Sequence, residues 1–278
     1  MDKQIKHVLG LSGGKDSSAL ALYTREKYPE IDFEYFFTDT GKELPEVYEY
    51  LDMLEGFLGK PILRLNGQHF DYWLVKSNGF LPSPKNRWCT AYMKLKPFED
   101  WLKPWIEDGT EIRSYVAIRS DEEYREAYLS KYPNLKVIMP FQDDHINITG
   151  VRDILKSSGI GIPKYYEWRS RSGCTFCFFQ QKIEWVRLRE RHPEAFEEAK
   201  AYEKYAADND SPFTWIAGEP LTELEKPERI EQIKADYSRR VIKLSLKKVV
   251  NPLHPEDDTV DIDEVYGAIG KACWACHK

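Results

Sequence analysis

Short apolar runs alternate with amphipathic segments in the first half of the chain. Five apolar runs predict β-strands: residues 5–11, 33–37, 61–65, 114–118 and 136–139. Apolar side chains at helical spacing predict helices over residues 18–28 and 45–58, between these strands. Alternating strands and helices are typical of a parallel sheet that is covered on both faces. We therefore expect an α/β fold, a parallel twisted sheet with helices on both faces.

The second half of the chain is richer in charged helical segments. Helices are expected over residues 151–158, 180–207 and 227–246, and Pro193 can split the second of them. A polar, acidic linker follows over residues 251–263. The change in pattern predicts a boundary near residue 150, between an N-terminal domain (residues 1–150) and a cysteine-containing, mainly helical C-terminal lobe (residues 151–278).

The composition is that of a folded protein. The 278 residues are 42% hydrophobic and 31% charged, which excludes a disordered or low-complexity chain. The formal net charge of −6 gives no sign of a general affinity for nucleic acid. No uncharged apolar run approaches the ~18 residues of a membrane span, and no signal peptide is visible. We therefore expect a cytoplasmic protein with no membrane association.

A glycine-containing loop, Ser-Gly-Gly-Lys-Asp-Ser over residues 12–17, joins the first predicted strand to the first predicted helix. Its glycines allow positive φ angles and a close approach of the backbone to a ligand. The backbone N–H groups at the start of the helix then form a site that favours an anion. Lys15 adds a positive charge, and Asp16 could cap the helix or help to hold Mg²⁺. The loop lacks the Walker A spacing.

This loop resembles the pyrophosphate loop of the ATP pyrophosphatases (PP-loop enzymes), which cleave ATP between its α- and β-phosphates. Four later segments, in order, are similar to motifs of the phosphoadenosine-phosphosulfate-reductase-like branch of that family: residues 37–46, 87–97, 117–125 and 161–177. The pattern is closest to that of the DNA-phosphorothioation sulfurtransferases. The resemblance implies the adenine nucleotide alpha hydrolase-like fold for residues 1–150.

The resemblance also implies roles for individual residues. The nucleotide, ATP with Mg²⁺, would be held by Ser12, Gly13, Gly14, Lys15, Asp16, Ser17, Asp39, Thr40, Arg87 and Lys94. The catalytic residues would be Lys15, Asp16, Arg119, Asp121 and Glu122. Two alternatives remain open from the residues alone. Arg119 and Glu122 could form an ordinary surface ion pair, and Asp39 could be a turn residue before Gly41.

The five cysteines are odd in number and mostly paired as Cys-x-x-Cys, which favours metal or redox chemistry over a disulfide framework. The candidate metal ligands are Cys89, Cys174, Cys177, Cys273 and Cys276. Converging thiolates suit a [4Fe-4S] cluster or Zn²⁺, and the resemblance favours the cluster. A free Cys89 and a zinc site built from the two Cys-x-x-Cys pairs remain alternatives.

Two enzyme activities fit these motifs. In the first, ATP adenylates an acceptor and sulfur then displaces AMP, with a cysteine desulfurase as sulfur donor and DNA or tRNA as the possible acceptor. In the second, a cysteine reduces phosphoadenylyl or adenylyl sulfate. Lys15 and Asp16 favour the first, because the loop of the reductases typically lacks this pair. A nucleotide-sensing subunit of a larger complex is a third hypothesis. Residues 164–171 interleave aromatic and basic side chains, which can stack nucleic-acid bases or form a packed loop.

Overall fold

The chain folds around a five-stranded parallel sheet. The computed structural model describes residues 5–122, 132–210 and 213–248. The strand order is β3-β2-β1-β4-β5, and all neighbouring pairs run parallel. The strands are β1 (Ile5–Gly10), β2 (Phe33–Asp39), β3 (Ile62–Asn66), β4 (Glu111–Tyr115) and β5 (Leu135–Ile138). The predicted fold class is confirmed.

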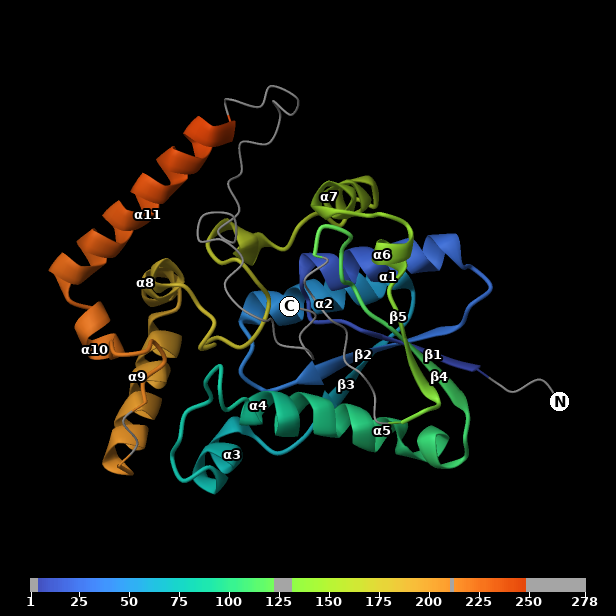
Figure 1. Cartoon of the computed structure of the whole chain (residues 1–278), viewed down its shortest axis with the longest axis horizontal. Helices are drawn as coiled ribbons and strands as arrows, with labels where there is room; N and C mark the ends of the chain where they lie inside the picture. Colours follow the sequence, from blue (N-terminus) through green and yellow to red (C-terminus); the bar gives the residue numbers. More distant parts are fainter. Residues whose placement is uncertain (1–4, 123–131, 211–212, 249–278) are drawn as a thin grey trace.

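Helices cover both faces of this sheet (Figure 1). On one face lie α1 (Lys15–Lys27), α2 (Pro45–Leu58), α6 (Pro140–Asp143) and α7 (Ile148–Ser157). On the other lie α3 (Phe70–Lys76), α4 (Trp88–Thr90), the π-helical η1 (Ala91–Leu95) and α5 (Lys96–Glu107). The 3₁₀ turn η2 (Lys164–Glu167) leads into a lobe of four helices: α8 (Lys182–Arg191), α9 (Pro193–Asp208), α10 (Leu221–Leu224) and α11 (Pro227–Lys248).

Most predicted elements form, with shifted ends. The helix expected from residue 18 begins at Lys15, because Gly14 adopts an extended conformation and serves as the N-cap. The strand expected over residues 114–118 lies at Glu111–Tyr115, where it pairs with both β1 and β5. The expected division of the long helix at Pro193 is confirmed, since α9 begins there. The linker expected over residues 251–263 lies outside the described residues.

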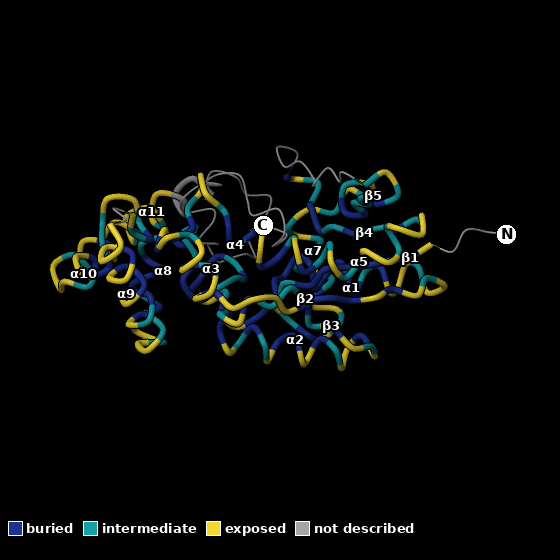
Figure 2. Tube along the Cα trace, turned by 90° about the horizontal axis from the view of Figure 1, so that it is seen from below, coloured by how far each residue is buried: buried dark blue, intermediate teal, exposed yellow. Residues whose placement is uncertain are grey.

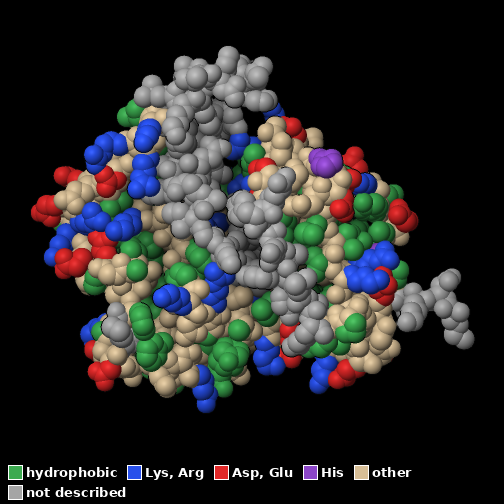
Figure 3. Space-filling model, viewed as in Figure 1, with side chains coloured by type: hydrophobic (Ala, Val, Ile, Leu, Met, Phe, Trp, Pro, Cys, Tyr) green, Lys and Arg blue, Asp and Glu red, His purple; other side chains and the backbone are tan. Residues whose placement is uncertain are grey.

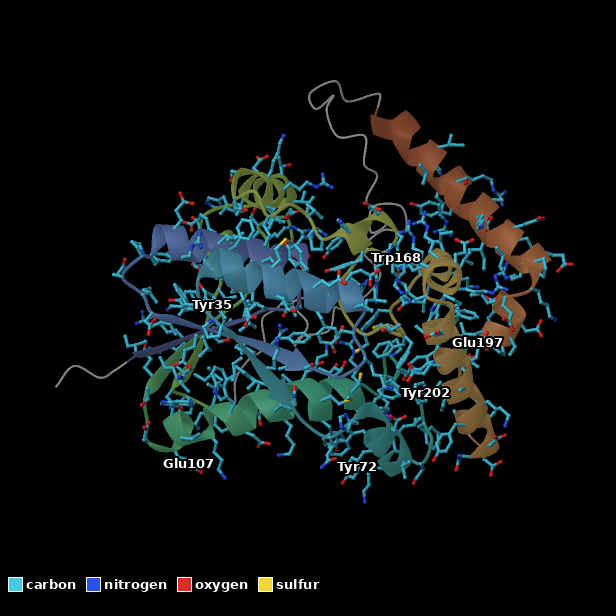
Figure 4. The ribbon with its side chains drawn as sticks, turned by 180° about the vertical axis from the view of Figure 1, so that it is seen from behind. Tyr35, Tyr72, Glu107, Trp168, Glu197 and Tyr202 are labelled. Carbon is cyan, nitrogen blue, oxygen red and sulfur yellow. The ribbon has the colours of Figure 1, made fainter. Side chains whose placement is uncertain are left out.

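One continuous core joins the sheet layer to the helical lobe. The main cluster of buried apolar side chains extends from Leu9 in β1 to Ile233 in α11. Tyr202 of α9 points toward α3, where its hydroxyl donates to Asp71 Oδ1 at 2.7 Å (Figure 4). Buried segments run through the strands and α1, whereas exposed positions lie mainly at the outer turns (Figure 2). The domain boundary near residue 150 stays a prediction, and α7 beyond it packs on α1.

The strand order places a topological switch point beside β1. β1 and β4 are neighbours in the sheet. The chain leaves β1 through residues 11–14 into α1, and it leaves β4 through residues 116–122. In open parallel sheets, ligands bind where two such loops diverge at the carboxyl ends of the strands. The residues of interest therefore follow β1, β2 and β4.

No helix in the described part of the chain is long and apolar enough to cross a membrane. Over the helical lobe, at the left of Figure 3, acidic and basic side chains are intermixed.

Candidate functional site

The loop after β1 is built to bring backbone donors together. Gly13 has φ +70°, and a Cβ at this position would lie 2.8 Å from Cγ1 of Val47 in α2. Glycine is required there on both grounds. Ser12 Oγ and Ser17 Oγ lie 3.3 Å apart, so two hydroxyls face each other across the loop. The loop leads directly into α1, whose amino end favours an anion.

Two tyrosines of η2 cover this loop from the second half of the chain. The Tyr165 hydroxyl donates to the carbonyl oxygen of Gly13 at 2.7 Å, and burial raises the pKa of Tyr165 well above its usual value. The Tyr166 hydroxyl accepts from the backbone N–H of Lys15 at 3.2 Å. The buried Lys15 ammonium lies 4.5 Å from the centre of the Tyr166 ring. The loop is therefore held by residues about 150 positions away.

Arg119 links the loop after β4 to the loop after β1. Its Nη1 donates to Asp16 Oδ1 at 2.9 Å, and its Nε donates to Asp121 Oδ1 at 2.9 Å. Glu122 Oε1 lies 3.6 Å from Nη2. Burial alone would lower the pKa of Arg119, but the carboxylates of Asp16 and Glu122 outweigh it and raise that pKa.

Three of the four side chains of this network are largely buried, and that of Asp121 is 37% exposed. The side chains of Arg119, Asp16 and Glu122 are 11%, 4% and 7% exposed. The alternative of an ordinary surface ion pair is therefore wrong. The network spans the switch point and fixes the first turn of α1 relative to the end of β4.

Asp39, the last residue of β2, and Thr40, which follows it, have different surroundings. Asp39 Oδ1 accepts from the Gly41 N–H and from the Tyr48 hydroxyl, both at 2.7 Å. This is the geometry of a turn residue, the alternative left open by the sequence. Thr40 is buried, and its Oγ1 lies 3.3 Å from Cys174 Sγ. Thr40 thus belongs with the cysteines.

Three of the five cysteines line one cleft. Its walls are formed by Cys89, Thr90, Lys94, Arg171, Ser172, Gly173, Cys174, Cys177, Phe178 and Phe179. Lys94 is buried in the wall, and the Arg87 guanidinium stacks at 5.0 Å over the ring of Phe179. The predicted association of Cys89 with the Cys-x-x-Cys loop is therefore present. Cys273 and Cys276 lie outside the described residues.

A buried carboxylate stands beside Cys174. Glu43 forms a β-bridge with Cys174, and Cys174 Sγ lies 3.6 Å from Glu43 Oε1. The Oε2 atom of Glu43 is buried without a hydrogen-bond partner. Burial, followed by the negative charge of Glu43, raises the pKa of Cys174 well above its usual value. A free thiol at this position is therefore protonated at neutral pH.

Residues 164–171 form a packed frame for the cysteine loop. Arg169 is fully buried, and its guanidinium donates to the carbonyl oxygens of Gly173 and Cys174 at 3.2 and 2.9 Å. Tyr165 and Trp168 are also buried, and Trp168 lies beside α8 (Figure 4). Arg169 thus holds the cysteine loop in place, and the three buried side chains are not free to stack bases.

The structure brings the predicted residues into two adjoining groups. The phosphate loop and the Arg119 network form one, and the three cysteines with Thr40 and Lys94 form the other. Sequence reasoning missed Glu43 and Ser172. Both lie within motifs that were noted, but the importance of Glu43 appears only in its bridge to Cys174, and that of Ser172 only in its hydrogen bond to Ser12.

Comparison with known families identifies the N-terminal part. Residues 6–143 match the phosphoadenosine phosphosulfate reductase domain. This match marks a reductase-like domain that spans just under half of the chain. The matched span includes the phosphate loop, Cys89 and the Arg119 network.

Two curated relatives align with much of the chain around this reductase-like domain. The uncharacterized protein MJ0066 of Methanocaldococcus jannaschii is 26% identical over 219 residues, which is 75% of this chain and 44% of the relative. An uncharacterized 37.8 kDa protein of Escherichia phage 186 is 26% identical over 258 residues, 72% of this chain and 75% of the relative. The chain thus spans less than half the length of MJ0066.

Solved structures similar to this chain include two enzymes. A phosphoadenylyl-sulfate reductase from Candida auris has 12% identity and a TM-score of 0.47, covering 61% of this chain and 81% of its own. The U34-tRNA thiolase NcsA from Methanococcus maripaludis, solved with its [4Fe-4S] cluster, has 18% identity and a TM-score of 0.39, covering 77% and 75%.

Proposed function

We propose that the protein is an ATP pyrophosphatase that adenylates an acceptor for sulfur transfer to a nucleic acid. The observation that carries this proposal is the contact between the two groups of residues. Ser172 lines the cysteine cleft, and its hydroxyl donates to Ser12 Oγ of the phosphate loop at 3.0 Å. A site for ATP phosphates and a site for sulfur chemistry therefore adjoin.

The reaction has two steps with defined leaving groups. An oxygen of the acceptor attacks the α-phosphorus of ATP, and pyrophosphate leaves. A sulfur nucleophile then attacks the acceptor atom that bears the adenylate, and AMP leaves with the acceptor's oxygen. DNA phosphorothioation and tRNA thiolation both fit this scheme. A cysteine desulfurase is the proposed sulfur donor, and a thiol reductant supplies the two electrons that convert its persulfide sulfur to the sulfide level.

Each group of residues has a role in this scheme. Residues 12–17 bind the phosphates through backbone N–H groups, hydroxyls and Lys15. The carboxylates of Asp16 and Asp121 are the oxygen donors that Mg²⁺ prefers. Arg119 orients these carboxylates, and Lys94 attracts an anionic acceptor to the cleft.

The donor chemistry of the cleft fits an iron–sulfur cluster or zinc. Three thiols, those of Cys89, Cys174 and Cys177, line one cleft and are the ligands such a group would take. Within the ranges described, no group of three or more His, Cys, Asp or Glu side chains is already arranged around a metal position. A bound [4Fe-4S] cluster would supply a binding position for the sulfur that is transferred. Zn²⁺ is the alternative, and Cys273 and Cys276 are further candidate ligands.

A sulfonucleotide reductase is the second candidate. The observation that favours it is the match of residues 6–143 to the reductase domain. A nucleotide-sensing subunit would bind ATP at the same loop without turnover.

Product analysis separates these functions. The full chain, purified anaerobically, is incubated with Mg²⁺, a thiol reductant, and DNA or tRNA as the acceptor. ATP, adenylyl sulfate or phosphoadenylyl sulfate is added to separate samples, and pyrophosphate and sulfite are measured. Our proposal predicts pyrophosphate from ATP and no sulfite. Lys15→Met should abolish this release, whereas Lys27→Met, at the exposed carboxyl end of the same helix, should preserve it. Sulfite without pyrophosphate would favour the reductase, and neither product would favour the sensing subunit.

A further inference from the structure

Ser172 occupies an unusual place for a loop serine. Its residue is 6% exposed, and its Oγ donates to Ser12 Oγ, which in turn lies 3.3 Å from Ser17 Oγ. Three hydroxyls thus converge at the phosphate loop, and one of them comes from the other half of the chain. A Cβ on Gly14 would lie 2.7 Å from Ser172 Oγ, so the glycine makes room for this hydroxyl.

The segment that carries Ser172 also carries Cys174. The Arg169 guanidinium donates hydrogen bonds to the carbonyl oxygens of Gly173 and Cys174. The Thr175 N–H donates to the Lys42 carbonyl at 2.6 Å. Gly173, which lies between Ser172 and Cys174, has φ +132°, a conformation that other residues rarely adopt. A displacement of Ser172 therefore changes the backbone that positions Cys174.

We propose that Ser172 is a ligand of the nucleotide phosphates, and that nucleotide binding through Ser172 fixes the conformation of the cysteine loop. The Ser172 hydroxyl now donates to a neutral hydroxyl. It forms a stronger hydrogen bond when a charged phosphate oxygen becomes its acceptor instead. The bound nucleotide then regulates the loop that bears Cys174, so sulfur chemistry is prepared only when ATP is present. This inference rests on the proposed function, because it requires ATP at residues 12–17.

A matched pair of variants tests the inference. Ser170 and Ser172 are both buried, but Ser170 Oγ has no hydrogen-bond partner and does not reach the phosphate loop. Ser172→Ala and Ser170→Ala in the full chain are compared with the wild type. The probe is α,β-methylene ATP with Mg²⁺, and its affinity is measured by calorimetry. Hydrogen–deuterium exchange of residues 173–176 reports on the cysteine loop.

The proposal predicts a specific pattern. The nucleotide should slow exchange at residues 173–176 in the wild type and in Ser170→Ala, but not in Ser172→Ala. Ser172→Ala should also bind the probe about 10- to 100-fold more weakly, the effect of losing one hydrogen bond to a charged group. Ser170→Ala should bind it normally.

Three results would overturn the proposal. If Ser172→Ala and Ser170→Ala bind the probe with equal affinity, Ser172 is not a ligand of the nucleotide. If the nucleotide leaves the exchange of residues 173–176 unchanged in the wild type, nucleotide binding does not fix the cysteine loop. This comparison needs no variant. Each of these leaves the proposed function intact, whereas no binding of the probe to the wild type would refute both.

Discussion

Replacement of Arg119 by methionine tests whether the network across the switch point is a structural necessity. The change removes a buried charge and leaves the carboxylates of Asp16 and Glu122, which are 4% and 7% exposed, without their common partner. Removal of one member of a buried ion pair costs about 3–5 kcal/mol, because the remaining charge stays desolvated. We expect Arg119→Met to lower the free energy of unfolding by this amount, or the melting temperature by about 6–20 °C.

The control lies in β4 itself. Arg113 pairs with Glu111 at 2.8 Å, but its side chain is 36% exposed. Such a pair contributes about 0.2–1 kcal/mol, so Arg113→Met should be nearly neutral. Urea unfolding followed by circular dichroism measures both variants. Equal midpoints for the two variants would refute the reasoning.

Three further predictions concern other residues. Gly13→Ala should cost about 2–5 kcal/mol in urea unfolding, because it combines a positive φ with a contact of 2.8 Å to Val47; no loss would contradict the loop geometry. In the reduced, metal-free chain, Glu43→Gln should speed the alkylation of Cys174 by iodoacetamide at pH 8, because it removes a charge that, after burial, raises the pKa of this thiol; an unchanged rate would exclude Glu43 as a cause. Burial raises the pKa of Glu203 above 4.5, so this group contributes a loss of stability as the pH rises through and above 4.5. In thermal unfolding Glu203→Gln should therefore gain stability relative to the wild type as the pH rises over this range, and an unchanged difference would contradict the prediction.

The local pattern of the sequence was sufficient for the sheet and the phosphate loop. β1 is a short apolar run, and the two glycines that precede α1 indicate the turn between these elements. No helix was predicted over residues 70–107. Pro104 lies inside α5 and η1 is π-helical, which breaks the stretch into short pieces, although α5 itself is amphipathic.

Outside the phosphate loop and the Cys-x-x-Cys pairs, the site was predictable only where the resemblance named a residue. Cys89 and Cys174 are 85 positions apart, and motif order alone brought them together before the cleft was visible. Glu43 and Ser172 carry no comparable signal, because their importance arises from one β-bridge and one hydroxyl contact across the fold. Arg169 is a similar case, since a basic residue among aromatics gave no indication that it would be fully buried.

The central claim is that this chain cleaves ATP between the α- and β-phosphates. ATP labelled on the α-phosphate is incubated with the anaerobically purified full chain, Mg²⁺, sulfide, and DNA or tRNA as the acceptor, and the labelled products are separated. Our account predicts labelled AMP with one pyrophosphate per turnover, and no product from Lys15→Met. Labelled ADP, or the same AMP yield from the Lys15 variant, would contradict it.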